Sequence, residues 1–514
     1  MSSLKDRLDP RPESTQEDNS PKPAPSSEDA EAAGLLSTLD INKNGKPEEP
    51  KETESKEVKE SKEEPKEEIK EKKDEAKEEN DETKKEEKAD TKEDSNLIKS
   101  TYEVQVKLKD LQADPNSPLY SAKSFEDLGL SEELLKGLYA MKFSKPSKIQ
   151  EKALPLLLSN PPQNMIGQSQ SGTGKTAAFV LNMLSRVDVN VNSPQALCLS
   201  PSRELARQTM DVINEMGKYT KVTTGFAIPE AVPKGQSINS QVIVGTPGTV
   251  MDLIRRKQLQ VSKIKVFVLD EADNMLDQQG LGSQCARVKK TLPKECQLVL
   301  FSATFPKAVY DYALGFVPDA NEIRLKAEEL NVDQIKQLYI DCDSKQDKVT
   351  KLMDIYSLLT IGSSMIFTQT KATADDLYKQ LSAEGHKVSV LHGNLDNSER
   401  DRLMDEFRDG KSKVLITTNV IARGIDIPSV TMVVNFDVPL NAEGRPDPAT
   451  YLHRIGRTGR FGRQGVSITF VHDKESYKQF QQIVSAFKEG ITVTHVKTDD
   501  PEELEEIVTQ ALKA

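Results

Sequence analysis

The stretch that most constrains the fold is NMIGQSQSGTGKTAAF, residues 164–179. It begins as an apolar strand end, continues through glycines and a lysine, and enters TAAFVLNML, a good helix former. Because backbone amides and a helix N-terminus together bind phosphate oxygens, this strand–loop–helix order predicts a phosphate-binding loop. The general pattern begins with Gly where this chain has Ser169, and the nearby Gly167 is out of register and belongs to the strand. We place the phosphate cradle at Gly172 to Thr176.

Two series of short apolar runs predict two tandem α/β domains with parallel sheets. The first series is QALCLS, QVIVGT, IKVFVLD and LVLFSAT, and the second is SMIFTQT, KVSVLHG, KVLITTN, VTMVVNF and VSITFVH. TYEVQVKLKD precedes them as a short strand or an extended arm, and the polar KAEELNVDQIKQ separates the two series. We therefore expect an N-terminal extension with the first domain at 97–326, a linker at 327–336 and a second domain with a C-terminal helix at 337–514.

Residues 1–96 are predicted to be a disordered acidic tail. Residues 51–90 hold 12 Lys and 18 Asp or Glu with almost no apolar residue, so they cannot bury enough surface to fold. A long solvated helix supported by Glu–Lys pairs is the alternative for this stretch. Residues 1–90 carry a net charge of −11 against −12 for the whole chain, so the remainder is nearly neutral and can still bind nucleic acid through local basic patches. Leu36, Leu39 and Ile41 are the apolar anchors of a candidate short binding segment or nuclear export signal.

The four cysteines are far apart and form no C-x-x-C pair, which favours reduced thiols in a cytosolic or nuclear protein. Neither a hydrophobic signal region at the N-terminus nor a long uncharged apolar run is present. We expect no membrane insertion, and we expect a monomer.

An acidic motif and an arginine motif add catalytic chemistry to the loop. Asp270 and Glu271 end a predicted buried strand, where a carboxylate can hold Mg²⁺ and its neighbour can orient or deprotonate water. In the loop, Lys175 would bridge the β- and γ-phosphates and the Thr176 hydroxyl would ligate the metal. Far along the chain, HRIGRTGR at 453–460 is either a face that grips RNA phosphates or a source of arginine fingers for the γ-phosphate.

Seven motifs in order resemble those of the DEAD-box RNA helicases of superfamily 2. They are SQSGTGKT, PSRELA, TPGT, DEAD, SAT, ARGID and HRIGRTGR, and the match covers about residues 125–480. MKFSKPSKIQ upstream resembles the adenine-reading Q motif of this family, with Lys142 where many members have Gly. Members of the family usually have Ala at the position of Ser169, so this serine is a modest change in a working loop. Thr249 likewise replaces the Arg common after TPG.

The resemblance implies two RecA-like domains, ATP and Mg²⁺ as cofactors, and a role for each matching residue. Lys175, Asp270, Glu271, Arg457 and Arg460 would be catalytic, with Thr176 and Asp270 as metal ligands. The residues implied to bind ATP are Phe143, Gln150, Ser169, Gln170, Ser171, Gly172, Thr173, Gly174, Lys175, Thr176, Gly424 and Asp426. The residues implied to contact the RNA backbone are Pro201, Arg203, Thr246, Gly248, Thr368 and Thr418. The residues implied to couple nucleotide state to RNA binding are Asp273, Ser302, Thr304 and His453.

The departures from the family pattern resemble the subgroup that acts in nuclear mRNA export. They include AIPEAVPKG, HGNLDN, GLGSQC and the inserted NAEGRPDPAT. This subgroup implies single-stranded RNA or mRNA as ligand, with a β-propeller nucleoporin and a helical activator dependent on inositol hexakisphosphate as partners. It also implies a cytoplasmic and nuclear protein enriched at the cytoplasmic face of the nuclear pore. Three alternatives stay open, namely another RNA step such as translation initiation, a non-catalytic ATP-gated RNA clamp, and a DNA helicase.

Overall fold

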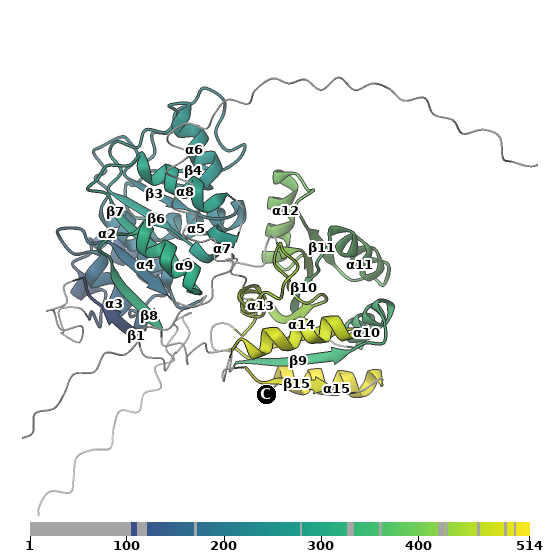
Figure 1. Cartoon of the computed structure of the whole chain (residues 1–514). Helices are drawn as coiled ribbons and strands as arrows, with labels where there is room; N and C mark the ends of the chain where they lie inside the picture. Colours follow the sequence, from purple (N-terminus) through teal and green to yellow (C-terminus); the bar gives the residue numbers. More distant parts are fainter. Residues whose placement is uncertain are drawn as a thin grey trace, which may run out of the picture. The chain divides into compact units, whose positions relative to one another are not determined.

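The computed structural model describes residues 104–109, 121–168, 172–277, 280–325, 334–358, 362–419, 427, 430–459, 463–487, 491–497 and 500–513. They belong to one compact unit that contains two α/β domains, each built on its own sheet (Figure 1). The tail predicted for residues 1–96 lies outside the described residues.

The first sheet has the strand order β1-β8-β2-β7-β6-β3-β5-β4 and is parallel except for β1, which pairs antiparallel with β8. Its central strands are short apolar runs without exposed positions, as expected for strands covered on both faces. The strands are β1 (Val104–Lys107), β2 (Met165–Gln168), β3 (Ala196–Leu199), β4 (Thr224–Ala227), β5 (Val242–Gly245), β6 (Val266–Leu269), β7 (Gln297–Ser302) and β8 (Asn321–Leu325).

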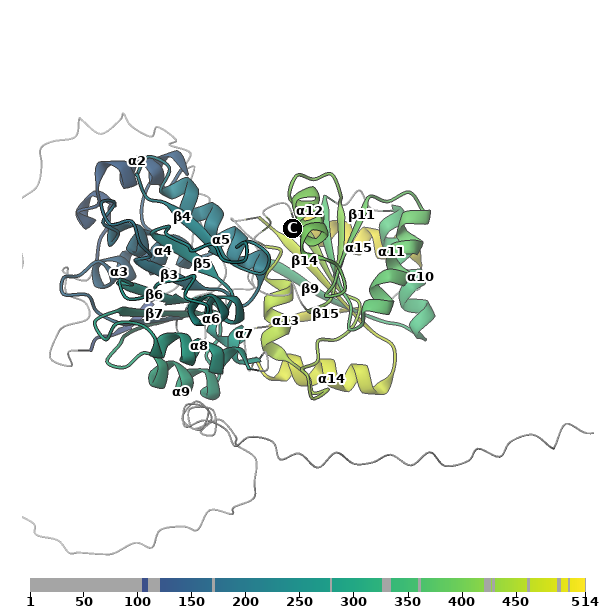
Figure 2. The same ribbon diagram turned by 90° about the horizontal axis from the view of Figure 1, so that it is seen from above.

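Helices cover both faces of this sheet, and each face has its own apolar core (Figure 2). One core contains residues of α2 (Glu132–Ala140), α3 (Lys148–Leu157), α4 (Lys175–Ser185) and α5 (Arg203–Met216). The other contains residues of α6 (Pro247–Arg255), α7 (Ala272–Asp277), α8 (Leu281–Lys290) and α9 (Lys307–Phe316). A 3-10 turn, η2 (Glu126–Leu128), precedes α2.

The second sheet is parallel throughout, in the order β11-β12-β10-β13-β14-β9-β15. Its strands are β9 (Ile335–Asp341), β10 (Ser363–Phe367), β11 (Val388–Leu391), β12 (Val414–Thr417), β13 (Val430–Asn435), β14 (Gly465–Val471) and β15 (Val493–Val496).

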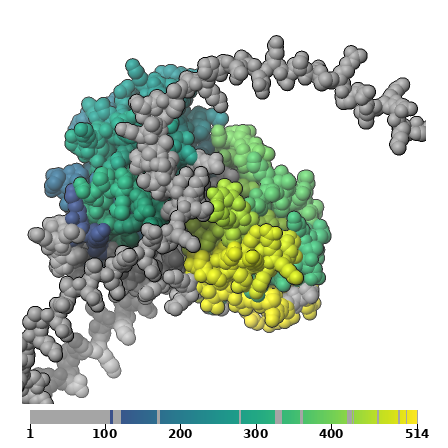
Figure 3. All heavy atoms as spheres, in the orientation of Figure 1, coloured from purple at the N-terminus to yellow at the C-terminus, as the bar shows by residue number. Residues whose placement is uncertain are grey.

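The helices of the second domain also divide between separate apolar cores. Residues of α10 (Lys345–Leu358), α11 (Lys371–Ala383) and α15 (Pro501–Lys513) share one core. Residues of α12 (Asn397–Arg408) belong to a second, and those of α13 (Pro448–Ile455) and α14 (Lys474–Ser485) to a third. The C-terminal elements contribute a yellow surface to the face of the molecule drawn in Figure 3.

The prediction of two parallel-sheet α/β domains is confirmed, and each run of the two predicted series coincides with a strand. The short strand suggested at TYEVQVKLKD is β1, which adds to the edge of the first sheet. Strands β4, β8, β9 and β15 were not recognised in the sequence, because their apolar residues alternate with polar ones or are too few. No helix in the described ranges is long and apolar enough to cross a membrane.

Candidate active site and RNA surface

The phosphate loop joins the end of β2 to the start of α4. Gly172 and Gly174 have φ of 81° and 98°, and only glycine adopts such angles without strain. Lys175, the first residue of α4, is 6% exposed. The predicted loop residues Ser169, Gln170 and Ser171 lie outside the described residues.

Gly167 has a packing role rather than a phosphate-binding one. It is the third residue of β2, and a Cβ on it would lie 2.3 Å from the ring of Phe301 on the neighbouring strand β7. No side chain larger than hydrogen fits there, so this glycine is required by the sheet.

The first turn of α3, which belongs to the Q motif, holds the phosphate loop through hydrogen bonds. Ser147 and Gln150 form a capping box, in which the Ser147 backbone N–H donates to Gln150 Oε1 at 2.9 Å. From the same turn, Ser147 Oγ donates to the Thr173 carbonyl at 2.7 Å and Gln150 Nε2 donates to the Gly174 carbonyl at 3.0 Å. Two loop carbonyls are therefore fixed by one helix end. The implied adenine contacts of Gln150 and of the half-buried Phe143 stay predictions.

Asp270 and Glu271 stand at the end of β6, and both are almost completely buried. The Glu271 backbone N–H donates to Asp270 Oδ1 at 3.0 Å, and Glu271 has a φ of 54°, a left-handed conformation that is costly for a residue with a side chain. Oε2 of Glu271 is shielded and makes no hydrogen bond within the described part of the chain. Such strain and an unpaired buried oxygen are typical of a catalytic carboxylate.

The charge balance of this pair fits a divalent cation. Burial raises the pKa of Asp270, the Glu271 carboxylate raises it further, and Lys175 only partly opposes these effects. Carboxylate and hydroxyl oxygens are ligands that Mg²⁺ prefers. Asp270 with the Thr176 hydroxyl at the start of α4 would hold the ion, which supplies the positive charge that Lys175 alone does not.

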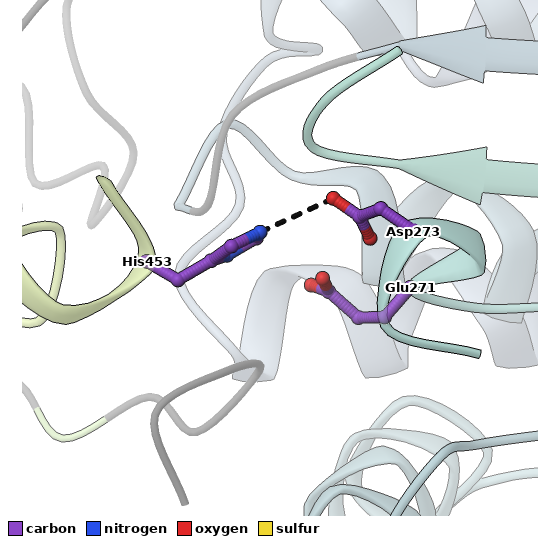
Figure 4. Close-up of side chains that lie close together, drawn as sticks. All are labelled: Glu271, Asp273 and His453. Atoms are coloured by element: carbon purple, nitrogen blue, oxygen red, sulfur yellow. Dashed lines mark hydrogen bonds and ion pairs between the residues drawn. The ribbon is translucent and has the colours of Figure 1, made fainter. Parts of the chain in front are cut away.

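The Asp273 carboxylate connects the DEAD motif with SAT and with HRIGRTGR. Its contact with His453 is drawn in Figure 4. Its Oδ2 accepts hydrogen bonds from the Thr304 backbone at 3.1 Å, from Thr304 Oγ1 at 2.7 Å and from His453 Nε2 at 3.1 Å. The Asp273 backbone N–H donates to Ser302 Oγ at 3.2 Å. The sequence placed all four residues in one coupling group, and the structure brings them together. Glu271, Asp273 and His453 lie close enough together to hold a metal ion. Oδ2 of Asp273 already accepts three hydrogen bonds, so this oxygen serves the contact between motifs.

The arginines of HRIGRTGR occupy different environments. Arg454 is fully buried, and its guanidinium donates to Asn419, to Asn435 and to the Asp437 carbonyl. It anchors α13 to the sheet, a role that spacing alone did not reveal. Arg457 lies beyond the end of α13, and its Nε donates to the His453 carbonyl at 2.8 Å. Arg460 lies outside the described residues, so the arginine fingers stay a prediction.

The residues implied to contact RNA all follow the carboxyl end of a parallel strand. Because these ends share one edge in each sheet, the sequence positions converge on a ligand-binding edge. The strands and the residues that follow them are β3 with Pro201 and Arg203, β5 with Thr246 and Gly248, β10 with Thr368, and β12 with Thr418. The ARGID residues Gly424 and Asp426 lie outside the described residues.

Thr249, which replaces the common Arg, bonds locally instead of reaching outward. Thr246 Oγ1 lies 3.2 Å from Thr249 Oγ1 across the first turn of α6. Thr249 therefore replaces a long cationic side chain with a short hydroxyl at this edge.

Ion pairs between α5 and α12 were not anticipated from the sequence. Arg203 contacts the Asp401 carboxylate at 2.7 Å, and Arg207 contacts it at 2.9 Å. Arg400 lies 2.5 Å from the buried Glu204 carboxylate. An alternation of Arg and acid on both helices was the only available signal, and nothing in it names the partner helix.

Comparison with known proteins identifies the family. The DEAD/DEAH box helicase model matches residues 147–312, and the helicase conserved C-terminal domain model matches residues 344–462. The ATP-dependent RNA helicase DBP5 of Meyerozyma guilliermondii is 68% identical over 420 residues, which cover 82% of this chain and 87% of the relative.

Two solved structures are also similar. Saccharomyces cerevisiae Dbp5 bound to RNA and ADP BeF3 matches with a TM-score of 0.73 and 64% identity, over 76% of this chain and all of that one. A variant of the same yeast protein bound to Nup159, a Gle1 variant, IP6 and ADP matches with a TM-score of 0.56 and 62% identity, over 75% of this chain and all of that one.

Proposed function

This chain belongs to the DEAD-box ATP-dependent RNA helicases, and on that premise we propose how its residues couple ATP hydrolysis to RNA. One observation carries the proposal. The Asp273 carboxylate binds both Thr304, in the first domain, and His453, in the second. A change at Asp270 and Glu271, the acids proposed to face the nucleotide, can thereby reach the motif that carries the candidate arginine fingers.

In the proposed site, Lys175 and the loop amides hold the ATP phosphates, and Glu271, whose backbone has the left-handed conformation, orients or deprotonates the attacking water. Thr176 and Asp270 would hold Mg²⁺, which would supply positive charge beside the phosphates. Arg457 and Arg460 stabilise the transition state when RNA is bound, so hydrolysis depends on RNA. RNA is bound mainly through its backbone at the strand ends described above, which gives little sequence preference.

The test is ATP hydrolysis by the full chain with and without single-stranded RNA, for the native protein and for Glu271→Gln. We expect RNA to stimulate turnover of the native protein. The variant keeps shape and packing but lacks the carboxylate, so we expect it to hold RNA tightly with ATP and to turn over at least 100-fold more slowly. If RNA does not stimulate the native protein, the mechanism is wrong.

We further propose that the protein remodels messenger ribonucleoprotein during mRNA export, at the cytoplasmic face of the nuclear pore. The proposal is supported by the identity with DBP5 and by the yeast complex with Nup159, Gle1 and IP6. The partners of this chain would be a β-propeller nucleoporin and an activator dependent on inositol hexakisphosphate. We also propose 97–326, 327–336 and 337–514 as the first domain, linker and second domain, although β9 of the second sheet already begins at Ile335, so the last two residues of this linker belong to the second domain.

The cellular role is tested by pulldown of the full chain with the propeller domain of the nucleoporin from the same organism. Binding together with stimulation of the ATPase by the activator and inositol hexakisphosphate is the expected result. Absence of both would assign the enzyme to another RNA step, such as translation initiation, without changing its chemistry.

A further inference from the structure

Lys371 and Asn394 make a contact in the second domain that none of the roles assigned above explains. Lys371 is the first residue of α11, and its Nζ donates to Asn394 Oδ1 at 2.5 Å. Both residues are exposed. The ammonium also lies over the backbone of Gly393, since a Cβ on that glycine would be 3.9 Å from Nζ. The lysine side chain therefore joins the segment that follows β10 to the segment that follows β11.

This contact lies at the carboxyl edge of the second sheet, across the end of β12. The sheet order is β11-β12-β10, and the last residues of these strands, Leu391, Thr417 and Phe367, are in register. Neighbouring strands are about 4.8 Å apart, so a side chain that joins the ends of β10 and β11 spans about 10 Å and passes the end of β12.

The two residues expected to contact RNA in this domain stand at the same edge. The Thr368 backbone N–H donates to the Thr417 carbonyl at 2.9 Å, and Thr418 follows directly in the chain. Thr417 Oγ1 in turn donates to the Leu391 carbonyl at 2.8 Å, which fixes the end of β11 beside the other two strand ends. An RNA strand bound by Thr368 and Thr418 would therefore pass the Lys371 ammonium.

The charge of Lys371 is left uncompensated by its partner. Asn394 accepts a hydrogen bond from the ammonium but carries no charge, and Lys371 forms no ion pair in the described part of the chain. Asp375, one turn further along α11, contacts His392 Nε2 at 2.9 Å instead. An ammonium held by an amide keeps its attraction for a phosphate, whereas a carboxylate in the same place would cancel most of it.

Resting on the RNA-binding function above, we propose that Lys371 binds a backbone phosphate of single-stranded RNA and that Asn394 positions the ammonium without neutralising it. Because every nucleotide carries the same phosphate, this contact adds affinity and no sequence preference. Asn394 belongs to HGNLDN, one of the stretches that depart from the family pattern, so this residue would set the strength of RNA binding in this chain.

The test is the salt dependence of binding of the full chain to a ten-nucleotide RNA with a non-hydrolysable ATP analogue, measured by fluorescence anisotropy. Each phosphate of a single strand that a lysine neutralises contributes about 0.7 to the slope of log affinity against log salt. Lys371→Met should reduce the slope by about 0.7 and weaken binding about three- to tenfold at physiological salt. Asn394→Asp should reproduce both effects because its carboxylate pairs with the ammonium, whereas Asn394→Ser should keep the slope.

Lys379→Met is the matched control, since Lys379 lies on the same helix, is exposed and pairs with Asp376 at 3.5 Å. It removes the same charge from α11, so an equal change of slope in this variant would show a long-range charge effect and overturn the phosphate contact. A series of RNAs with one uncharged methylphosphonate linkage at each position in turn locates the contact. One linkage that weakens binding to the native protein should have no effect on Lys371→Met.

The outcomes separate this proposal from the helicase function. If RNA binds the native protein and stimulates its ATPase, but Lys371→Met leaves the slope unchanged, the phosphate contact is overturned and the function stands. If Lys371→Met lowers the slope and Asn394→Asp does not, the role of Asn394 is wrong. If RNA neither binds the native protein nor stimulates its ATPase, the function itself fails.

Discussion

His453 Nε2 lies 3.1 Å from Oδ2 of Asp273, although 180 residues separate the two in the chain. Both side chains are almost completely buried, and the same carboxylate oxygen accepts from Thr304. An acid of the DEAD motif is thereby connected to two other motifs through a single atom. Loss of a hydrogen bond to this atom should therefore reduce RNA-stimulated hydrolysis more than it reduces ATP binding.

His453→Ala is expected to lower RNA-stimulated turnover by about 10- to 100-fold, because a buried hydrogen bond to a charged group contributes about 1.5–3 kcal/mol. ATP affinity without RNA should stay close to native. The measurement is steady-state ATPase activity against RNA concentration, with His495→Ala on β15 as control. Equal loss of basal and stimulated activity would instead mean that the side chain only supports folding.

Arg400→Ala is expected to weaken the contact between α5 and α12. Glu204, which is 3% exposed, would remain buried without its cation, and RNA-stimulated activity should fall by about tenfold. Glu204→Gln in the same chain should recover part of this loss, so the two changes will not add. Arg402→Ala is the matched control, since Arg402 is exposed and its ion pairs within the described residues are with Glu399 and Glu406 of its own helix. If the effects of Arg400→Ala and Glu204→Gln add in this double-mutant cycle, the two residues are not coupled.

Lys142→Gly is expected to stabilise the first domain by about 0.5–1 kcal/mol. Lys142 follows the C-cap of α2 with a φ of 64°, where glycine avoids the strain of a Cβ and Gly is common in the family. Urea unfolding checks this, with Lys136→Gly inside α2 as a control that should destabilise by about 1 kcal/mol. A loss of stability in Lys142→Gly would show that the lysine side chain makes a compensating contact.

Asp270→Asn is expected to abolish hydrolysis while stabilising the protein without nucleotide at pH 8. The pKa of Asp270 is raised in the fold, so its favourable contribution is present below the unfolded pKa and is lost as the pH rises through the folded pKa. Asparagine stays uncharged, so the variant does not lose this contribution to the free energy of unfolding. We expect it to be more stable than the native protein by about 1–3 kcal/mol at pH 8 and by less at pH 5. Urea unfolding at both pH values measures it, with the exposed Asp252→Asn as control. The same change at pH 5 and pH 8 would contradict the explanation.

The local features of this protein follow from its amino-acid sequence alone. Strand runs, the phosphate loop and the order of the motifs depend on neighbouring residues, and they predicted two parallel sheets and the edges where ligand-binding residues gather. Convergence on those edges follows from parallel pairing, which needs no knowledge of side-chain packing.

The partner that each side chain contacts depends instead on how the folded chain packs. The ring of Phe301 leaves room only for glycine at position 167. Two asparagines bind the Arg454 guanidinium, and Asp401, on a helix of the other domain, binds Arg203. The strands that escaped recognition were likewise set by sheet pairing rather than by their own pattern. A hydrogen bond or an ion pair requires atoms within about 3–4 Å, and for residues far apart in the chain that distance comes from packing rather than from sequence spacing.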